Sequence, residues 1–179
     1  MNIPFEMGYT FDENLREKPI SLAEMKQGIV FLKEHLHESS LYGKNCGLIG
    51  VYERIAGNLS DSEYYLQKAI EYYTQTDNIQ VLFINKLRLA HTYHWERKFA
   101  AANTIFAELL QTLPDLPAYE DFFYQHYGKS KLDEGDFQTA LTCFQKALQI
   151  RLQKGNEELI HSTTLCIEHC MSRQLNMDV

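Results

Sequence analysis

One pattern of apolar residues recurs along this chain and constrains its fold more than any other feature. Within each copy the residues follow the first at offsets of 3, 4, 7 and 8, and in two copies also at 11, so they share one face of a helix. Three strong copies and one weaker copy begin at Ser62, Ala102, Ala140 and Gly28. Successive copies begin 34, 40 and 38 residues apart. A repeat of this length corresponds to one helix pair and predicts an α-helical solenoid.

A second helix precedes each strong copy, and a short turn joins the two. These helices include residues 48–57, 89–98 and 127–136. Each contains a small residue, Gly50, Ala90 or Gly128, at which two helix backbones could approach closely. Gly57 and Gly135 stand where a helix ends and a left-handed residue is favoured. The chain is therefore expected to form consecutive helix pairs.

The predicted organisation is one all-α domain at residues 21–172, between two short tails at residues 1–20 and 173–179. Ser21 and Glu24 have the spacing of a capping box, so the first helix is expected at about 21–38. Three helix pairs are expected within 41–155.

A closing helix is expected at about 157–172. Its inward residues are expected to be Leu159, Leu165, Cys166 and Met171. In the N-terminal tail, Phe5, Tyr9 and Phe11 are apolar enough to dock back on the helices or to help a dimer form. A homo-oligomer is therefore one possible assembly.

The charge and cysteine content exclude several classes of protein. A net charge of −7 disfavours nucleic-acid binding, which depends on cationic contacts to phosphates. No apolar run is long enough to cross a membrane, and the N-terminus does not have the pattern of a signal peptide. The four cysteines have no paired metal-binding spacing and are too few for a disulfide framework. We therefore expect a cytoplasmic protein with reduced thiols and neither a nucleic-acid nor a membrane partner.

The repeats resemble the tetratricopeptide repeat family. The matching positions are Leu89, Ala90, Tyr93, Phe99, Ala102, Phe106 and Pro114 in the middle repeat, and Gly128, Gly135, Asp136, Phe137, Ala140, Phe144, Lys146, Ala147 and Leu148 in the third. The first repeat is weaker, with Ser62 where the family prefers alanine, and the family's early tryptophan is missing from all three. A period of 38–40 residues resembles the long repeats of kinesin light chains, the Pins/LGN spindle adaptors and bacterial peptide-receptor regulators.

This resemblance implies an α-α superhelix whose first helices line a concave groove for a segment of another chain. Helix geometry then selects the groove residues: Val51, Arg54, Ile55, Leu87, His91, His94, Trp95, Gln125, Lys129 and Leu132. This set is apolar and mildly cationic. We therefore expect a protein or peptide partner with apolar side chains and at least one carboxylate. The competing interpretation is that Arg54 and Lys129 are simply solvated helix residues.

Two functions fit this groove, and neither is enzymatic. The first is a protein- or peptide-binding adaptor, and the second is a regulator that senses a small signalling peptide and changes its contact with an effector. An enzyme would have to depend on His91 or His94, but this pair has no third metal ligand at helical spacing. Cys166 and Cys170 are more typical of apolar filling than of a zinc site. No phosphate loop, nucleophile elbow or paired catalytic carboxylates occur, so neither a metal nor a cofactor is expected.

Overall fold

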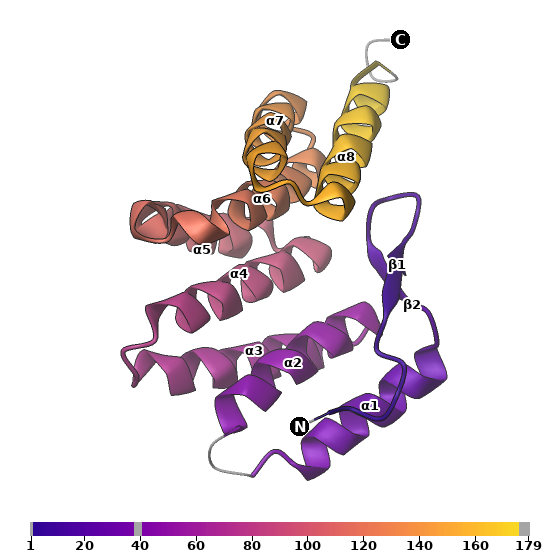
Figure 1. The fold of residues 1–179 in the computed structure, drawn as a ribbon, viewed down its shortest axis with the longest axis vertical. Helices are drawn as coiled ribbons and strands as arrows, with labels where there is room; N and C mark the ends of the chain where they lie inside the picture. Colours follow the sequence, from indigo (N-terminus) through magenta and orange to yellow (C-terminus); the bar gives the residue numbers. More distant parts are fainter. Residues whose placement is uncertain (1, 38–40, 176–179) are drawn as a thin grey trace. The chain divides into compact units, whose positions relative to one another are not determined.

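The computed structural model describes residues 2–37 and 41–175, and the regular structure of these residues is α-helical apart from one short β-hairpin and two 3-10 turns (Figure 1). Helices pack mainly on their neighbours in sequence, so the predicted all-α, repeat-like fold is confirmed. The chain divides into two compact units, residues 1–96 (unit 1) and residues 97–179 (unit 2), and each is described by itself.

Unit 1 contains the hairpin and four helices. Its elements are β1 (Tyr9–Phe11), β2 (Glu17–Pro19), α1 (Leu22–Glu34), α2 (Tyr42–Ile55), α3 (Leu59–Thr74) and α4 (Ile79–Trp95). Helix α2 packs on α1 and α3, and α3 packs on α4. Strand β2 contacts α2, which brings the N-terminal segment back onto the helices. Helix α1 ends at Glu34, before the expected end at about residue 38, which itself lies outside the described residues.

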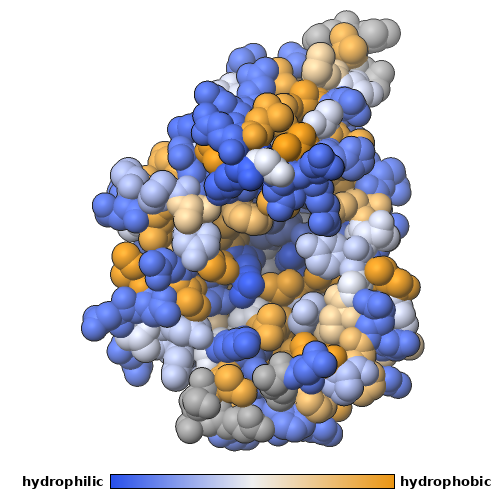
Figure 2. Space-filling view, viewed as in Figure 1, coloured by the Kyte–Doolittle hydropathy of each residue, from blue (hydrophilic) through white to orange (hydrophobic). Residues whose placement is uncertain are grey.

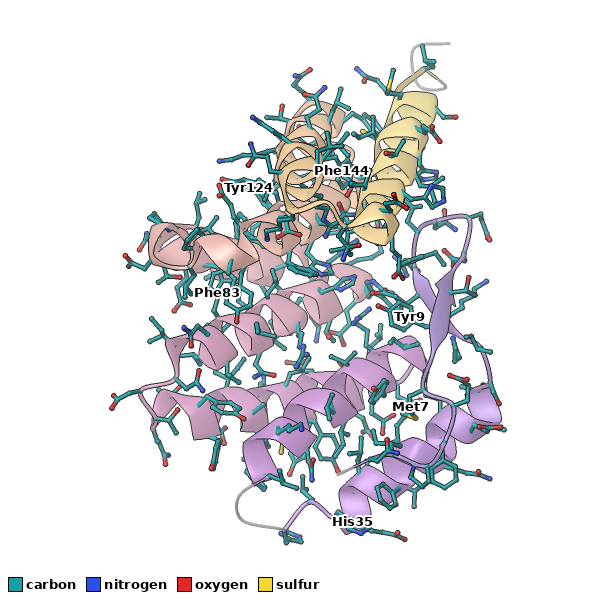
Figure 3. The ribbon with its side chains drawn as sticks, viewed as in Figure 1. Met7, Tyr9, His35, Phe83, Tyr124 and Phe144 are labelled. Carbon is teal, nitrogen blue, oxygen red and sulfur yellow. The ribbon has the colours of Figure 1, made fainter. Side chains whose placement is uncertain are left out.

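The N-terminal segment is folded, although the sequence suggested a tail. The side chains of Ile3 and Met7 pack against the core formed by Met25, Ile29, Leu32, Ile49 and Ile55. Met7 reaches this position because Gly28 of α1 has no side chain; a Cβ atom there would lie 2.2 Å from the Met7 sulfur. Figure 3 shows Met7 beside α1. Residues 2–8 therefore complete the core of unit 1.

Helix α1 begins with half of the expected capping box. Oγ of Ser21 accepts a hydrogen bond from the Glu24 N–H at 3.3 Å. The carboxylate of Glu24 accepts a bond of 2.7 Å from the backbone N–H of Glu6. This side chain thus fastens the N-terminal segment to α1.

The repeated pattern is confirmed for the first residue of each strong copy and for the residues at offsets of 4 and 7. These residues are buried in all three strong copies: Ser62, Leu66 and Ala69; Ala102, Phe106 and Leu109; Ala140, Phe144 and Ala147. The residues at offset 8 are less buried than expected, and one of them, Leu110, is exposed. The Ser62 hydroxyl lies 2.8 Å from that of Thr92 on α4, so this departure from alanine has a buried polar partner.

Two predicted roles of glycine are also confirmed. An added Cβ at Gly50 would lie 2.5 Å from Cγ of Leu66, and one at Gly128 would lie 2.7 Å from the Phe144 ring. These glycines therefore permit close packing of α2 on α3 and of α6 on α7. Gly57 and Gly135 end helices with φ angles of +90° and +88°.

Unit 2 contains the remaining helices. Its elements are α5 (Phe99–Thr112), η1 (Leu113–Asp115), η2 (Pro117–Tyr119), α6 (Glu120–Glu134), α7 (Phe137–Lys154) and α8 (Glu157–Leu175). Helix α7 has 18 residues. After α5 the chain forms two 3-10 turns, each with a proline in its first turn. Helix α7 is thus long, and two turns lengthen the stretch between α5 and α6.

Helix α8 differs from its predicted orientation. Its buried residues are Thr163, Cys166 and Cys170, whereas Leu165 and Met171 are 37% and 51% exposed. The expectation that these two residues point inward is therefore wrong, because the packed face lies about one residue away. The helix also continues to Leu175, through the first part of the expected C-terminal tail. None of the described helices is long and apolar enough to cross a bilayer, and hydrophilic and hydrophobic residues are interspersed over the surface seen in Figure 2.

Candidate peptide-binding site

Three of the predicted groove residues come together in unit 1, with a fourth residue that the sequence did not indicate. Arg54 lies in the last turn of α2, and His91 and Trp95 lie one turn apart near the end of α4. We call these three residues the Arg54 recess. The side chain of Glu17, from β2, reaches into it.

The central contact is a buried ion pair. Nη1 of Arg54 donates to Oε2 of Glu17 at 2.8 Å, and Nη2 lies 3.4 Å from Oε1. Nε2 of His91 is 3.9 Å from the same Oε2. The Arg54 and Glu17 side chains are only 4% and 7% exposed, so solvent screens their attraction weakly.

Trp95 forms a second layer of contacts. Its indole N–H donates to Nε2 of His91 at 2.9 Å, so this nitrogen is an acceptor and carries no proton. The guanidinium carbons of Arg54 and Arg16 lie 4.8 Å and 5.3 Å from the Trp95 ring centroid, within the range of cation–π attraction. The imidazole of His94 stacks on that of His91, with centroids 5.6 Å apart. The Trp95 ring thus contacts both Arg54 and His91, the two residues that lie next to the Glu17 carboxylate.

The loop of the β-hairpin positions Glu17. The carboxylate of Asp12 accepts hydrogen bonds of 2.9 Å from the N–H groups of Asn14 and Arg16. Leu15 takes a left-handed conformation with φ of 61°, which is disfavoured for a branched side chain. β1 pairs antiparallel with β2, and Phe11 stands opposite Glu17. Glu17 enters the recess directly after this tight, partly strained turn.

The charges around the recess favour an anion. Burial, and then the nearby charge of Arg54, lowers the pKa of Arg88 on α4 below its ordinary value. Arg16 adds a second guanidinium over the Trp95 ring, beside that of Arg54. A carboxylate from an extended segment is thus the natural occupant of this part of unit 1.

The remaining predicted residues occupy different environments. Val51 packs against the α1–α2 core, and Leu87 is buried on α4. Gln125 and Lys129 belong to unit 2, where both are buried, and Nε2 of Gln125 donates to the Cys166 sulfur at 3.1 Å. Arg54, His91 and His94 are also buried, whereas the sequence suggested a surface open to solvent.

Glu17 is the member of the site that sequence reasoning missed. The available signal was the alternation of Ile3, Phe5 and Met7, which is typical of an extended segment with one buried face. An extended segment with one buried face is expected to dock on the helices. Its acidic residues could then have been proposed as partners of the cationic groove residues. No pattern in the sequence gives the register that selects Glu17.

The other candidate centres have simpler structures. Within residues 2–37 and 41–175, no three His, Cys, Asp or Glu side chains come close enough to hold a metal ion. All four cysteines are buried, and burial raises the pKa of Cys143 to about 11. Shallow depressions also lie on the described residues, among them one lined by Phe5, Val30 and Phe31 and one lined by residues around Pro114 and Pro117.

The Arg54 recess is thus a buried guanidinium, flanked by the His91 and Trp95 side chains, that pairs with a carboxylate carried by an extended strand. Comparison with known proteins adds no relative to this description: no protein-family model, no curated protein and no solved structure matches the chain.

Proposed function

We propose that this chain is a protein- or peptide-binding adaptor built from helix pairs that resemble tetratricopeptide repeats. The observation that carries the proposal is the burial of Glu17, on an extended strand, against Arg54 and His91. A site that holds one acidic, extended segment has the chemistry to hold a segment of another chain. The partner we propose is therefore a protein or peptide with an acidic residue among apolar ones.

A second candidate is a regulator that senses a short signalling peptide. It is supported by the contact between the hairpin and the recess, because a peptide that takes the place of Glu17 would also move residues 9–19. A change at the recess would then alter the surface that β1 presents, where Tyr9 and Phe11 are 47% and 41% exposed. The two candidates share the same site and differ in whether the hairpin carries the signal.

Glu-centred and Gln-centred peptides on an array would test the proposed function. The wild-type protein and the Glu17→Gln protein would be applied to short peptides with one central residue, Glu or Gln, flanked by apolar residues. We expect binding that requires Glu, because a neutral amide cannot replace a carboxylate opposite a buried guanidinium. Arg54→Met should abolish it. Lys68→Met, which removes an exposed partner of Glu71, is the matched control.

Two results would reject this function. The first is the absence of Glu-dependent binding in both the wild-type and the Glu17→Gln proteins. The second is binding that persists in Arg54→Met at the level of the Lys68→Met control. Circular dichroism of each variant would establish that the helices are intact.

A further inference from the structure

We infer that the hairpin at residues 9–19 is a built-in competitor, which occupies the Arg54 recess until an external acidic segment displaces it. This inference rests on the proposed function and adds its regulation. It also specifies the ligand: an extended segment that carries a carboxylate and a second hydrogen-bond acceptor.

The N-terminal segment has two parts that are held differently. Residues 2–8 are fixed by the packing of Ile3 and Met7 in the core and by the bond from Glu6 N–H to Glu24. The hairpin lies further out, and all three residues of β1 are exposed. Figure 3 shows Tyr9 on this strand. Residues 2–8 and the hairpin are thus held by different contacts, and displacement of the hairpin would leave the contacts of Ile3, Met7 and Glu6 in place.

The base of the hairpin is closed by its own backbone. The Ile20 N–H donates to the Gly8 carbonyl at 3.0 Å, so the two ends of the hairpin lie side by side. Ser21, the next residue, caps α1. Because the segments on both sides are anchored independently, rotation at Gly8 and Ile20 would move the hairpin as one body.

The contact between Glu17 and Arg54 leaves one hydrogen-bond donor of the Arg54 guanidinium unsatisfied in the part of the chain that the structure describes. Glu17 engages Nη1 and Nη2 of Arg54, whereas Nε is buried and, within the described residues, has no hydrogen-bond partner. An unsatisfied buried donor is unfavourable. A ligand that supplies a carboxylate and another acceptor to Nε would satisfy Arg54 more fully than Glu17 does.

The hairpin is also a weakened ligand. Leu15 at its turn has a φ angle of 61°, a conformation that a leucine adopts at an energetic cost. Since the hairpin is tethered to the recess, its high effective concentration compensates for this weakness. An external ligand displaces the hairpin only if it binds the recess more strongly than the tethered hairpin does.

Competition by a synthetic peptide would test the inference. The probe is residues 9–20 of this chain as a free peptide, and the readout is the fluorescence of Trp95, the only tryptophan. Wild type, Glu17→Gln and Glu13→Gln would be titrated in parallel. Glu13 is an exposed residue of the same turn and provides the matched control.

We expect Glu17→Gln to bind the peptide at least about tenfold more tightly than wild type and Glu13→Gln, because its own hairpin no longer competes. The same peptide with Gln at the position of Glu17 should bind at least about tenfold more weakly. Arg54→Met combined with Glu17→Gln should not respond. Leu15→Gly, which relieves the turn, should weaken binding of the external peptide.

Three outcomes would overturn the inference in distinguishable ways. Equal affinity of wild type and Glu17→Gln would reject the competitor and leave the proposed binding function standing. No binding by any variant that remains helical by circular dichroism would reject both. A wild-type dimer that Glu17→Gln abolishes, measured by light scattering, would show that the hairpin closes onto a second copy.

Discussion

Each unit buries an arginine against a carboxylate, but the two pairs are built differently. Arg54 in unit 1 meets Glu17 on a strand, whereas Arg151 in unit 2 meets Asp121 on α6. Nε of Arg151 donates to Asp121 at 3.0 Å, and its Nη1 donates to Thr163 of α8 at 2.7 Å. Arg151 thus joins three helices and uses its Nε, whereas Nε of Arg54 has no partner among the described residues.

This difference teaches how a buried charge can have either a structural or a binding role. Lys154 also pairs with Asp121, so the carboxylate of unit 2 has two cationic partners on α7. Moving Asp121 away would require α6 to separate from α7. Moving Glu17 away would require the hairpin at residues 9–19 to change position, whereas the helices of unit 1 could stay packed on one another. The comparison therefore predicts a structural role for Arg151 and, under the proposed function, a binding role for Arg54.

The largest expected effect is in unit 2. Asp121→Asn should lower the free energy of unfolding by about 3–5 kcal/mol, because it leaves Arg151 buried without its counter-charge. Urea denaturation followed by circular dichroism would measure this loss. Glu120→Gln, which removes a more exposed partner of Lys146, should cost less than about 1 kcal/mol. A similar loss of unfolding free energy for both variants would contradict a structural role for Arg151.

Glu17→Gln should have a smaller effect than Asp121→Asn, of about 1–2 kcal/mol, because the released hairpin exposes Arg54 to water. The same urea titration would measure it. A change in Trp95 fluorescence should accompany this substitution under native conditions, since Arg16, Arg54 and His91 all contact the ring. A loss as large as that of Asp121→Asn would show that the hairpin is as firmly fixed as α6, and the comparison between the units would fail.

Helix packing should be equally sensitive in the two units. Gly50→Ala and Gly128→Ala should each lower stability by about 1–2 kcal/mol, since overpacking outweighs the helix propensity of alanine. The added Cβ atoms would meet Leu66 and Phe144. Urea denaturation of the two single variants would compare the interfaces directly. A gain in stability for either variant would show that its interface can open at little cost.

The smallest effect is expected at the hairpin turn. Leu15→Gly should stabilise unit 1 by about 0.5 kcal/mol, because glycine adopts the left-handed conformation without strain. Thermal unfolding followed by circular dichroism would detect the change. Asn14→Gly, at a neighbouring position with an ordinary φ angle, should not stabilise the protein. A gain for both variants would attribute the effect to something other than the conformation of Leu15.

The helical part of the fold could be predicted from the sequence because its cause is local. The spacing of Leu66 and Ala69, or of Phe144 and Ala147, follows from helix geometry, and the glycines at 57 and 135 follow from backbone conformation. The orientation of α8 was harder, because Leu165 is apolar yet exposed, while Thr163 is polar yet buried. A helix at the end of an array has one packed side, and composition alone did not identify it.

The candidate site could be predicted only in part. Arg54, His91 and Trp95 were selected from helical spacing, and the structure brings them together. Their burial was not foreseen, because it depends on a contact between residues 37 positions apart. Such a pairing is set by the register of the hairpin and by Gly28, which admits Met7 to the core. These are tertiary effects that no short window of sequence encodes.

The closed base of the hairpin makes it a replaceable cassette. Because Gly8 and Ile20 meet through a backbone hydrogen bond, the amino acids between them can change without altering where the chain enters α1. Under the proposed regulation, substitutions in this stretch would change the affinity for an incoming acidic segment while the helices stayed the same. Designed loops at this position would then give a series of proteins that share the same helices and differ in how tightly the hairpin holds Arg54.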